Sequence, residues 1–208
     1  MRLPTFIMKT VACVLLVCGS VAVAGPLATD PSAFASGTAS FNATGDSGSL
    51  LVDLDFAVFE PGVYPDDGVL GNDPSNGSEW VYAYQGFNVG GAGDKVYSTV
   101  TIGLLEGSLA GNDGDDPLHV MLGGIGPIVT FVGVDSIVYN FSPQVAPGEF
   151  STVLLFTSPN EPFLDGAASV INGGLSDTQT GIPTPVPEPA MLVLMGLAGL
   201  AVVRRRRA

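Results

Sequence analysis

The sequence predicts an all-β protein whose main domain is an antiparallel β-sandwich, with a jelly-roll-like arrangement or a barrel as the alternative. From about Thr38 to Ile171, apolar and polar residues alternate in short runs, which is typical of half-buried strands. Turn-forming residues separate the runs. The 28 glycines and 16 prolines among 208 residues favour turns and short strands over long helices.

Five runs carry the alternation, and each is expected to form a strand. In the clearest run, residues 49–59, the apolar side chains occupy one face, whereas Asp53 and Asp55 are expected on the solvent face. Five or more strands separated by turns are enough for two packed sheets. The runs are Ser49 to Phe59, Glu79 to Gln85, Lys95 to Leu105, Ile128 to Tyr139 and Phe150 to Thr157.

Charge is distributed unevenly along the chain. All 20 acidic residues lie between Asp30 and Glu188, whereas Lys95 is the only basic residue between residues 25 and 203, which gives that region a net charge of −19. Such a domain repels phosphate, because nucleic-acid binding requires clustered Lys or Arg, so we exclude nucleic acid as a partner. Most of the carboxylates lack an ion-pair partner, and calcium therefore becomes a candidate ligand.

The N-terminus has the three-part pattern of a secretory signal peptide. Arg2 and Lys9 precede an apolar stretch, and Ala22-Val23-Ala24 places small residues at Ala22 and Ala24, where signal peptidase reads its substrate. Cleavage after Ala24 would start the mature chain at Gly25. Both cysteines of the sequence lie in the segment that would be removed, so we expect the mature protein to contain no thiol or disulfide.

The C-terminus combines an extended proline-rich segment, an apolar run and a basic tail. The prolines hold the first part extended, because proline fixes φ and disfavours helix in the preceding residue. The run from Ala190 to Val203 has 14 uncharged residues. As a helix it would be about 21 Å long, which is marginal for a bilayer core of about 30 Å. The positive-inside rule places the Arg tail in the cytoplasm and the acidic domain outside.

These three features together resemble the PEP-CTERM sorting signal of Gram-negative bacteria. The residues that carry the resemblance are Val186, Pro187, Glu188, Pro189, Arg204, Arg205, Arg206 and Arg207. The resemblance implies transient residence in the inner membrane through a short C-terminal helix and cleavage by an exosortase-like enzyme. It also implies delivery to the cell surface or extracellular matrix, often alongside extracellular polysaccharide.

We therefore expect four segments. They are a signal peptide (1–24), an acidic β-rich extracellular domain (25–173), a polar, proline-rich linker (174–185) and the sorting signal with its short transmembrane helix (186–208).

A loop rich in oxygen ligands is the candidate calcium site. Asn112, Asp113, Asp115 and Asp116 lie within five positions around the flexible Gly114. Calcium takes six to eight oxygen ligands, which such a loop can supply in part, but the closing Glu of an EF-hand is missing. A solvated turn explains the same residues, with Asp66, Asp67 and Asp73 as a thinner acidic cluster elsewhere.

An aromatic row offers a candidate sugar platform. Trp80, Tyr82 and Tyr84 alternate on one face of a predicted strand, about 7 Å apart, and rings in such a row can stack on sugars. Burial in the sandwich core explains the same row, because large rings stabilise a core directly.

No complete catalytic set is evident. Gly45-Asp46-Ser47-Gly48 resembles the nucleophile loop of trypsin-like proteases, but His119 is the only histidine and lies downstream, so a turn explains the tetrapeptide better. Asp53 and Asp55 could form a glycosidase-like carboxylate pair. We favour a non-catalytic surface or matrix protein over a calcium-dependent carbohydrate-binding or adhesive module, and over a secreted hydrolase.

Overall fold

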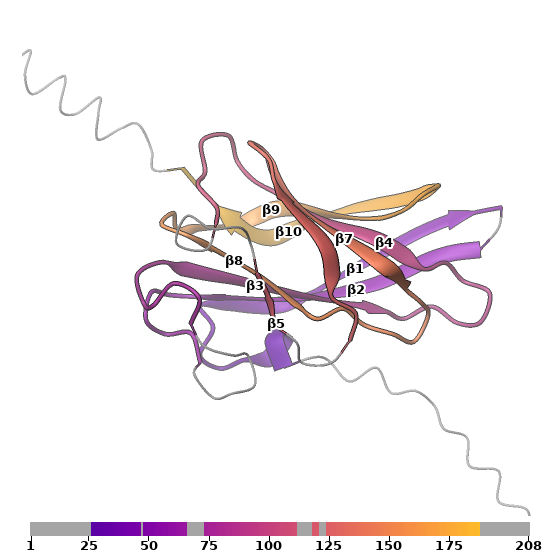
Figure 1. The fold of residues 1–208 in the computed structure, drawn as a ribbon, viewed down its shortest axis with the longest axis horizontal. Helices are drawn as coiled ribbons and strands as arrows, with labels where there is room; N and C mark the ends of the chain where they lie inside the picture. The colour runs from indigo at the N-terminus through magenta and orange to yellow at the C-terminus, as the bar shows by residue number, and fades with distance from the viewer. Residues whose placement is uncertain (1–25, 47, 66–72, 112–117, 121–123, 188–208) are drawn as a thin grey trace, which may run out of the picture.

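The computed structural model describes residues 26–46, 48–65, 73–111, 118–120 and 124–187, which form two antiparallel five-stranded sheets packed face to face (Figure 1). Sheet A has the spatial order β1 (Ala35–Gly45), β2 (Gly48–Phe59), β3 (Trp80–Asn88), β8 (Val153–Ser158), β5 (Leu118–Val120). Sheet B has the order β10 (Leu175–Pro185), β9 (Pro162–Asn172), β4 (Tyr97–Gly103), β7 (Ser136–Val145), β6 (Pro127–Val132). The arrangement confirms the predicted all-β sandwich.

Four of the five predicted runs correspond to single strands, namely β2, β3, β4 and β8. The prediction of one strand over the fifth run, residues 128–139, was wrong, because the chain reverses within this run and forms the hairpin of β6 and β7. At the reversal the backbone N–H of Gly133 donates to the carbonyl of Ser136 (2.7 Å). Strands β1, β9 and β10 include segments that the five runs did not cover.

The prediction of a linker at 174–185 was wrong. This segment forms β10, which pairs along most of its length with β9, from Leu175 opposite Asn172 to Pro185 opposite Pro162. Its exposed residues are Ser or Thr apart from Gly181, and its buried residues are confined to the last four positions, which include Ile182 and Thr184. The prolines are tolerated because β10 lies at the edge of its sheet, where an N–H on the open side needs no strand partner.

The main core fills the space between the two sheets. It contains three aromatic pairs or stacks, among them Tyr82 stacked on Phe156 with ring centroids 4.8 Å apart and Tyr97 edge-on to Phe141. Four tyrosines are completely buried in it. Its members come from both sheets and include Phe41, Leu50, Val52, Leu54, Val58, Tyr82, Tyr84, Tyr97, Val100, Ile102, Ile137, Tyr139, Val145, Leu154, Phe156 and Val170.

A second cluster, the outer core, lies on the opposite face of sheet A. The N-terminal segment with the 3₁₀ turn η1 (Pro26–Thr29) packs there, below sheet A in Figure 1, and buries Leu27 completely. Strands β2, β3 and β8 are therefore buried on both faces, which explains the continuous burial of β8. The members are Leu27, Ala57, Phe59, Tyr64, Val81, Ala83, Val153 and Leu155.

The prediction that Asp53 and Asp55 both face solvent is half wrong. Asp53 is half-exposed and accepts a hydrogen bond from the hydroxyl of Ser40 (2.6 Å). Asp55 is only 2% exposed and accepts one from the hydroxyl of Thr38 (2.5 Å). Both donors lie on β1, directly opposite their acceptors in the strand register. These hydrogen bonds give the two carboxylates a structural role in pairing β1 with β2.

Candidate functional site

The candidate functional site is the end of β10, where the folded domain meets the sorting signal. Val186 and Pro187 are the sorting-signal residues that the structure describes. The backbone N–H of Val186 donates to the carbonyl of Glu161 (2.9 Å), and the hydroxyl of Ser108 donates to the carbonyl of Pro185 (2.8 Å). The two bonds hold the chain against the domain immediately before the Pro-Glu-Pro sequence.

Gly107 lies close to the next residue, Pro187. A Cβ at this position would lie 3.6 Å from the Cβ of Pro187, and the backbone there has φ of +87°, which favours glycine. We call Gly107, Ser108 and Glu161, together with the segment 185–187 that they contact, the exit clamp. No sequence signal marks Gly107, Ser108 or Glu161, because they meet the segment 185–187 only when the strands pair.

The aromatic row is a core element, and the interpretation as a sugar platform is wrong for two of its members. Tyr82 and Tyr84 are completely buried, and their hydroxyls donate to the carbonyls of Asn160 (2.9 Å) and Pro183 (2.5 Å). Burial raises the pKa of both phenols. Trp80 is half-buried, packs against the main core and lies edge-on to Phe34 at 5.3 Å between centroids. A single half-buried ring does not form a platform.

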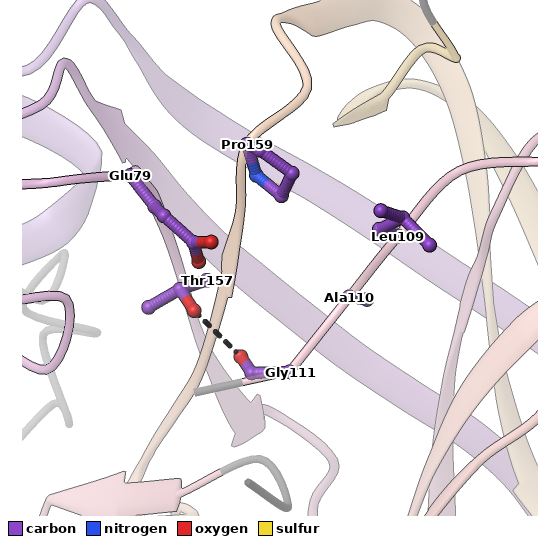
Figure 2. Close-up of a pocket in the computed structure, with 6 residues that line it drawn as sticks. All are labelled: Glu79, Leu109, Ala110, Gly111, Thr157 and Pro159. Atoms are coloured by element: carbon purple, nitrogen blue, oxygen red, sulfur yellow. Dashed lines mark hydrogen bonds between the residues drawn. The ribbon is translucent and has the colours of Figure 1, made fainter. Parts of the chain in front are cut away.

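A pocket of about 240 Å³ opens beside β8 (Figure 2). Figure 2 shows the Thr157 hydroxyl bonded to the carbonyl of Gly111 (2.9 Å), with the carboxylate of Glu79 on the same wall. Among the described residues that line it, Glu79 is the only carboxylate, and the Thr157 hydroxyl already donates its hydrogen to a backbone carbonyl. The lining residues are Glu79, Leu109, Ala110, Gly111, Thr157 and Pro159.

The pocket and the exit clamp are physically connected. Leu109, which lines the pocket, follows Ser108 of the clamp, and its backbone N–H donates to the side-chain oxygen of Asn160 (3.0 Å). The hydroxyl of Ser158 in turn donates to the carbonyl of Leu109 (2.5 Å). These hydrogen bonds therefore hold residues 105–111 in place between the pocket and the exit clamp.

The predicted calcium ligands Asn112, Asp113, Asp115 and Asp116 lie outside the described residues, as do Asp66 and Asp67. Asp73 is described: its carboxylate accepts hydrogen bonds from the backbone N–H and the hydroxyl of Ser75, both at 2.8 Å. This is a turn stabilised by its own residues. Within the part of the chain that the structure describes, no group of three or more His, Cys, Asp or Glu side chains is arranged to hold a metal ion.

The remaining sequence candidates take ordinary places in the fold. Gly45 and Gly48 pair across the β1–β2 hairpin, and Ser47 lies outside the described residues. His119 belongs to the short strand β5, opposite Leu154. The signal-cleavage residues Ala22 and Ala24 and the sorting-signal residues from Glu188 onward lie outside the described residues. So does the predicted C-terminal helix; among the described residues, no helix has the length and hydrophobicity needed to cross a membrane.

Comparison with known proteins agrees with the resemblance seen at the C-terminus. The family model of the PEP-CTERM protein-sorting motif matches residues 185–207, which begins at the last residue of β10. No curated protein and no solved structure matches the chain. The motif implies processing by exosortase-type machinery after passage through the membrane. The chain is therefore an exported protein that carries a PEP-CTERM protein-sorting motif at its C-terminus.

Proposed function

We propose that this protein is a non-catalytic cell-surface or extracellular-matrix protein of a Gram-negative bacterium, whose acidic sandwich is displayed after its sorting motif has been processed. The observation that carries the proposal is the direct continuation of β10 into the motif at Pro185. A signal peptidase and an exosortase-like enzyme are the processing partners, and extracellular polysaccharide is the proposed environment of the mature domain.

The exit clamp limits the positions at which the chain can be cleaved without loss of contacts in the folded domain. Tyr84 donates its hydroxyl to the carbonyl of Pro183, and Ser108 donates to the carbonyl of Pro185, so cleavage before Pro185 would remove an acceptor that the domain uses. Cleavage beyond Pro187 removes no contact that the described residues make. We therefore place processing after Pro187, close to the folded body and without an intervening linker.

The non-catalytic assignment rests on what the described candidates are used for. Asp53 and Asp55 bond to hydroxyls of β1, and Tyr82 and Tyr84 bond to backbone carbonyls inside the sandwich. These side chains are hydrogen-bonded within the fold and do not line an open cleft. A calcium-dependent carbohydrate-binding or adhesive module and a secreted hydrolase remain the alternatives, but no described contact favours either of them.

The test is the fate of the full chain in its own host. Glu188→Ala changes the centre of the motif, and we expect the protein to accumulate in the membrane fraction with its Arg tail uncleaved. Glu106→Ala is the matched control, because it removes an exposed carboxylate from a turn on the same domain. A host that lacks exosortase should reproduce the Glu188→Ala result. Normal delivery of the Glu188→Ala protein to the surface would overturn the proposal.

A glycan array probed with the mature protein, with and without calcium, separates the alternatives. The proposal expects no calcium-dependent binding to any glycan. Saturable binding that appears only with calcium would favour the adhesive module.

A further inference from the structure

The four edge strands of the sandwich differ in how they are protected. Strands β1 and β10 lie against each other, and the backbone N–H of Asn42 on β1 donates to the carboxylate of Asp177 on β10 (2.7 Å). Their exposed side chains are polar, as in Ser40 and Thr178. The described part of strand β5 is three residues long, and so short an edge strand offers few backbone groups for another strand to pair with.

Strand β6 has none of these protections in its central part. Val129 and Phe131 are 52% and 62% exposed on the outer side of sheet B, and the bulged Ile128 is 63% exposed. Because β6 ends its sheet among the described strands, alternate backbone N–H and C=O groups point away from β7. Pro127 removes one donor at the start of the strand only. Among the described residues, the edge therefore offers backbone groups without a strand partner next to apolar side chains.

The strand is also uncharged, in contrast to the rest of the domain. From Pro117 to Val134 the sequence contains no Asp, Glu, Lys or Arg, whereas the region 25–203 carries a net charge of −19. Two copies of so acidic a domain repel each other over most of their surfaces. At β6 they can approach without placing like charges opposite each other, since charges farther away are screened within about 8 Å at physiological salt.

We propose that two copies of this chain join edge to edge through β6, with the two strands antiparallel and centred on Thr130. In this register Phe131 of each copy lies opposite Val129 of the other, so an aromatic side chain meets a β-branched one twice on the outer face. Ile128, which is bulged and 63% exposed, lies opposite Val132 at each end of the paired segment. The interface is two-fold symmetric and joins the two B sheets into one continuous sheet.

The first test changes the charge of the edge and measures the mass of the processed protein by light scattering. Wild-type protein should have twice the monomer mass, and Phe131→Glu should weaken association roughly tenfold or more, because it removes both contacts with Val129 and places two carboxylates diagonally across the pair. Leu164→Glu is the matched control: it adds the same charge at a residue that is 53% exposed on β9, away from the edge. Equal dissociation by both variants would overturn the proposal, as would a wild-type monomer at tens of micromolar.

The salt dependence of association distinguishes a second copy of this chain from a basic protein as the partner. Association between two acidic copies should strengthen as sodium chloride rises, because screening reduces their repulsion. A complex with a basic protein should weaken as sodium chloride rises. That result would overturn the proposal that the partner is a second copy of this chain.

The second test fixes the register. Thr130→Cys should give a disulfide-linked dimer under oxidising conditions, because residue 130 lies opposite itself on the symmetry axis and both native cysteines lie in the predicted signal peptide. Ser176→Cys, exposed on β10, should give no such product. The crosslink can be read on chain that has lost residues 1–24, whether or not the sorting motif has been cleaved, so the outcome does not depend on sorting. Equal crosslinking of both variants, or a crosslink of Thr130→Cys to another protein, would contradict the register.

Discussion

The main core and the outer core hold sheet A from its two sides by different means. In the main core, four tyrosines donate their hydroxyls to backbone carbonyls, three of them across to the opposite sheet and Tyr82 to the connection between β8 and β9. In the outer core, mostly aliphatic side chains are covered by the short segment around Leu27. The difference indicates that the main core couples the two sheets and the chain end, whereas the outer core depends on one covering segment.

The largest expected effect concerns the four buried tyrosines and alkaline pH. Burial raises the pKa of Tyr82, Tyr84, Tyr97 and Tyr139 far above 10. Their contribution to stability is complete below pH about 10 and falls as pH rises, because the unfolded chain loses its phenolic protons first. The loss should reach about 1.4 kcal/mol per pH unit for each tyrosine. Urea unfolding between pH 9 and 12 measures it.

Two outcomes of that titration would separate the tyrosines from other causes. Tyr139→Phe should reduce the slope of stability against pH by the share of one tyrosine. An unfolding midpoint that does not change up to pH 12 would contradict the buried, protonated phenols.

The next largest effect should come from the outer core. Leu27→Ala should lower the free energy of unfolding by about 2–5 kcal/mol, because it leaves a cavity under a completely buried side chain. Leu164→Ala makes the same chemical change at a residue that is 53% exposed, and we expect a change within about 0.5 kcal/mol. Equal effects in urea unfolding would show that the segment around Leu27 does not cover the sheet.

A smaller effect should follow from removing one hydroxyl of the main core. Tyr84→Phe keeps the ring but leaves the buried carbonyl of Pro183 without that donor, which should cost about 1–3 kcal/mol. Because Pro183 lies on β10, hydrogen exchange should increase at the end of that strand before it increases in β2. Uniform exchange across both strands would argue against a specific link between Tyr84 and the chain end.

The smallest effect concerns Asp177 at the contact between β1 and β10. Its slight burial acts to raise the pKa of the carboxyl, but hydrogen bonds from Asn42, Gln179 and Thr178 outweigh this and lower it. The stabilisation is present above the ordinary carboxyl pKa and is lost as pH falls. Asp177→Asn should cost about 0.5 kcal/mol or less at neutral pH, since solvent screens the group. A shift in midpoint that persists at pH 2 would contradict an ionic origin.

The sequence predicted the fold where side chains alternate strictly and failed where the strand faces are polar. β2 was evident because large apolar residues recur at every second position, whereas β1 contains Phe41 as its only large apolar residue. β10 was interpreted as a linker because its exposed face is Ser and Thr and its end is proline-rich. Such strands gain stability from pairing and from their edge position, which a local pattern does not reveal.

The candidate site was predictable only from Val186 onward. Three features in a fixed order indicate the sorting motif, but Ser108 and Glu161 reach the motif through tertiary contacts between segments more than twenty residues away. The burial of Asp55 was missed for the same reason, because its donor Thr38 lies on a strand that the pattern did not show. The sequence showed which aromatic and which acidic residues share a strand face, but it did not show whether the rest of the fold would cover that face.

The central claim is that the domain extends through β10 and that processing occurs beyond it. Intact-mass spectrometry of the protein recovered from the cell surface tests this directly. The expected chain begins at Gly25, includes all of β10 up to at least Pro187 and lacks Arg204 to Arg207. Mature surface protein that still contains the arginine tail, or that ends before Pro185, would contradict the claim.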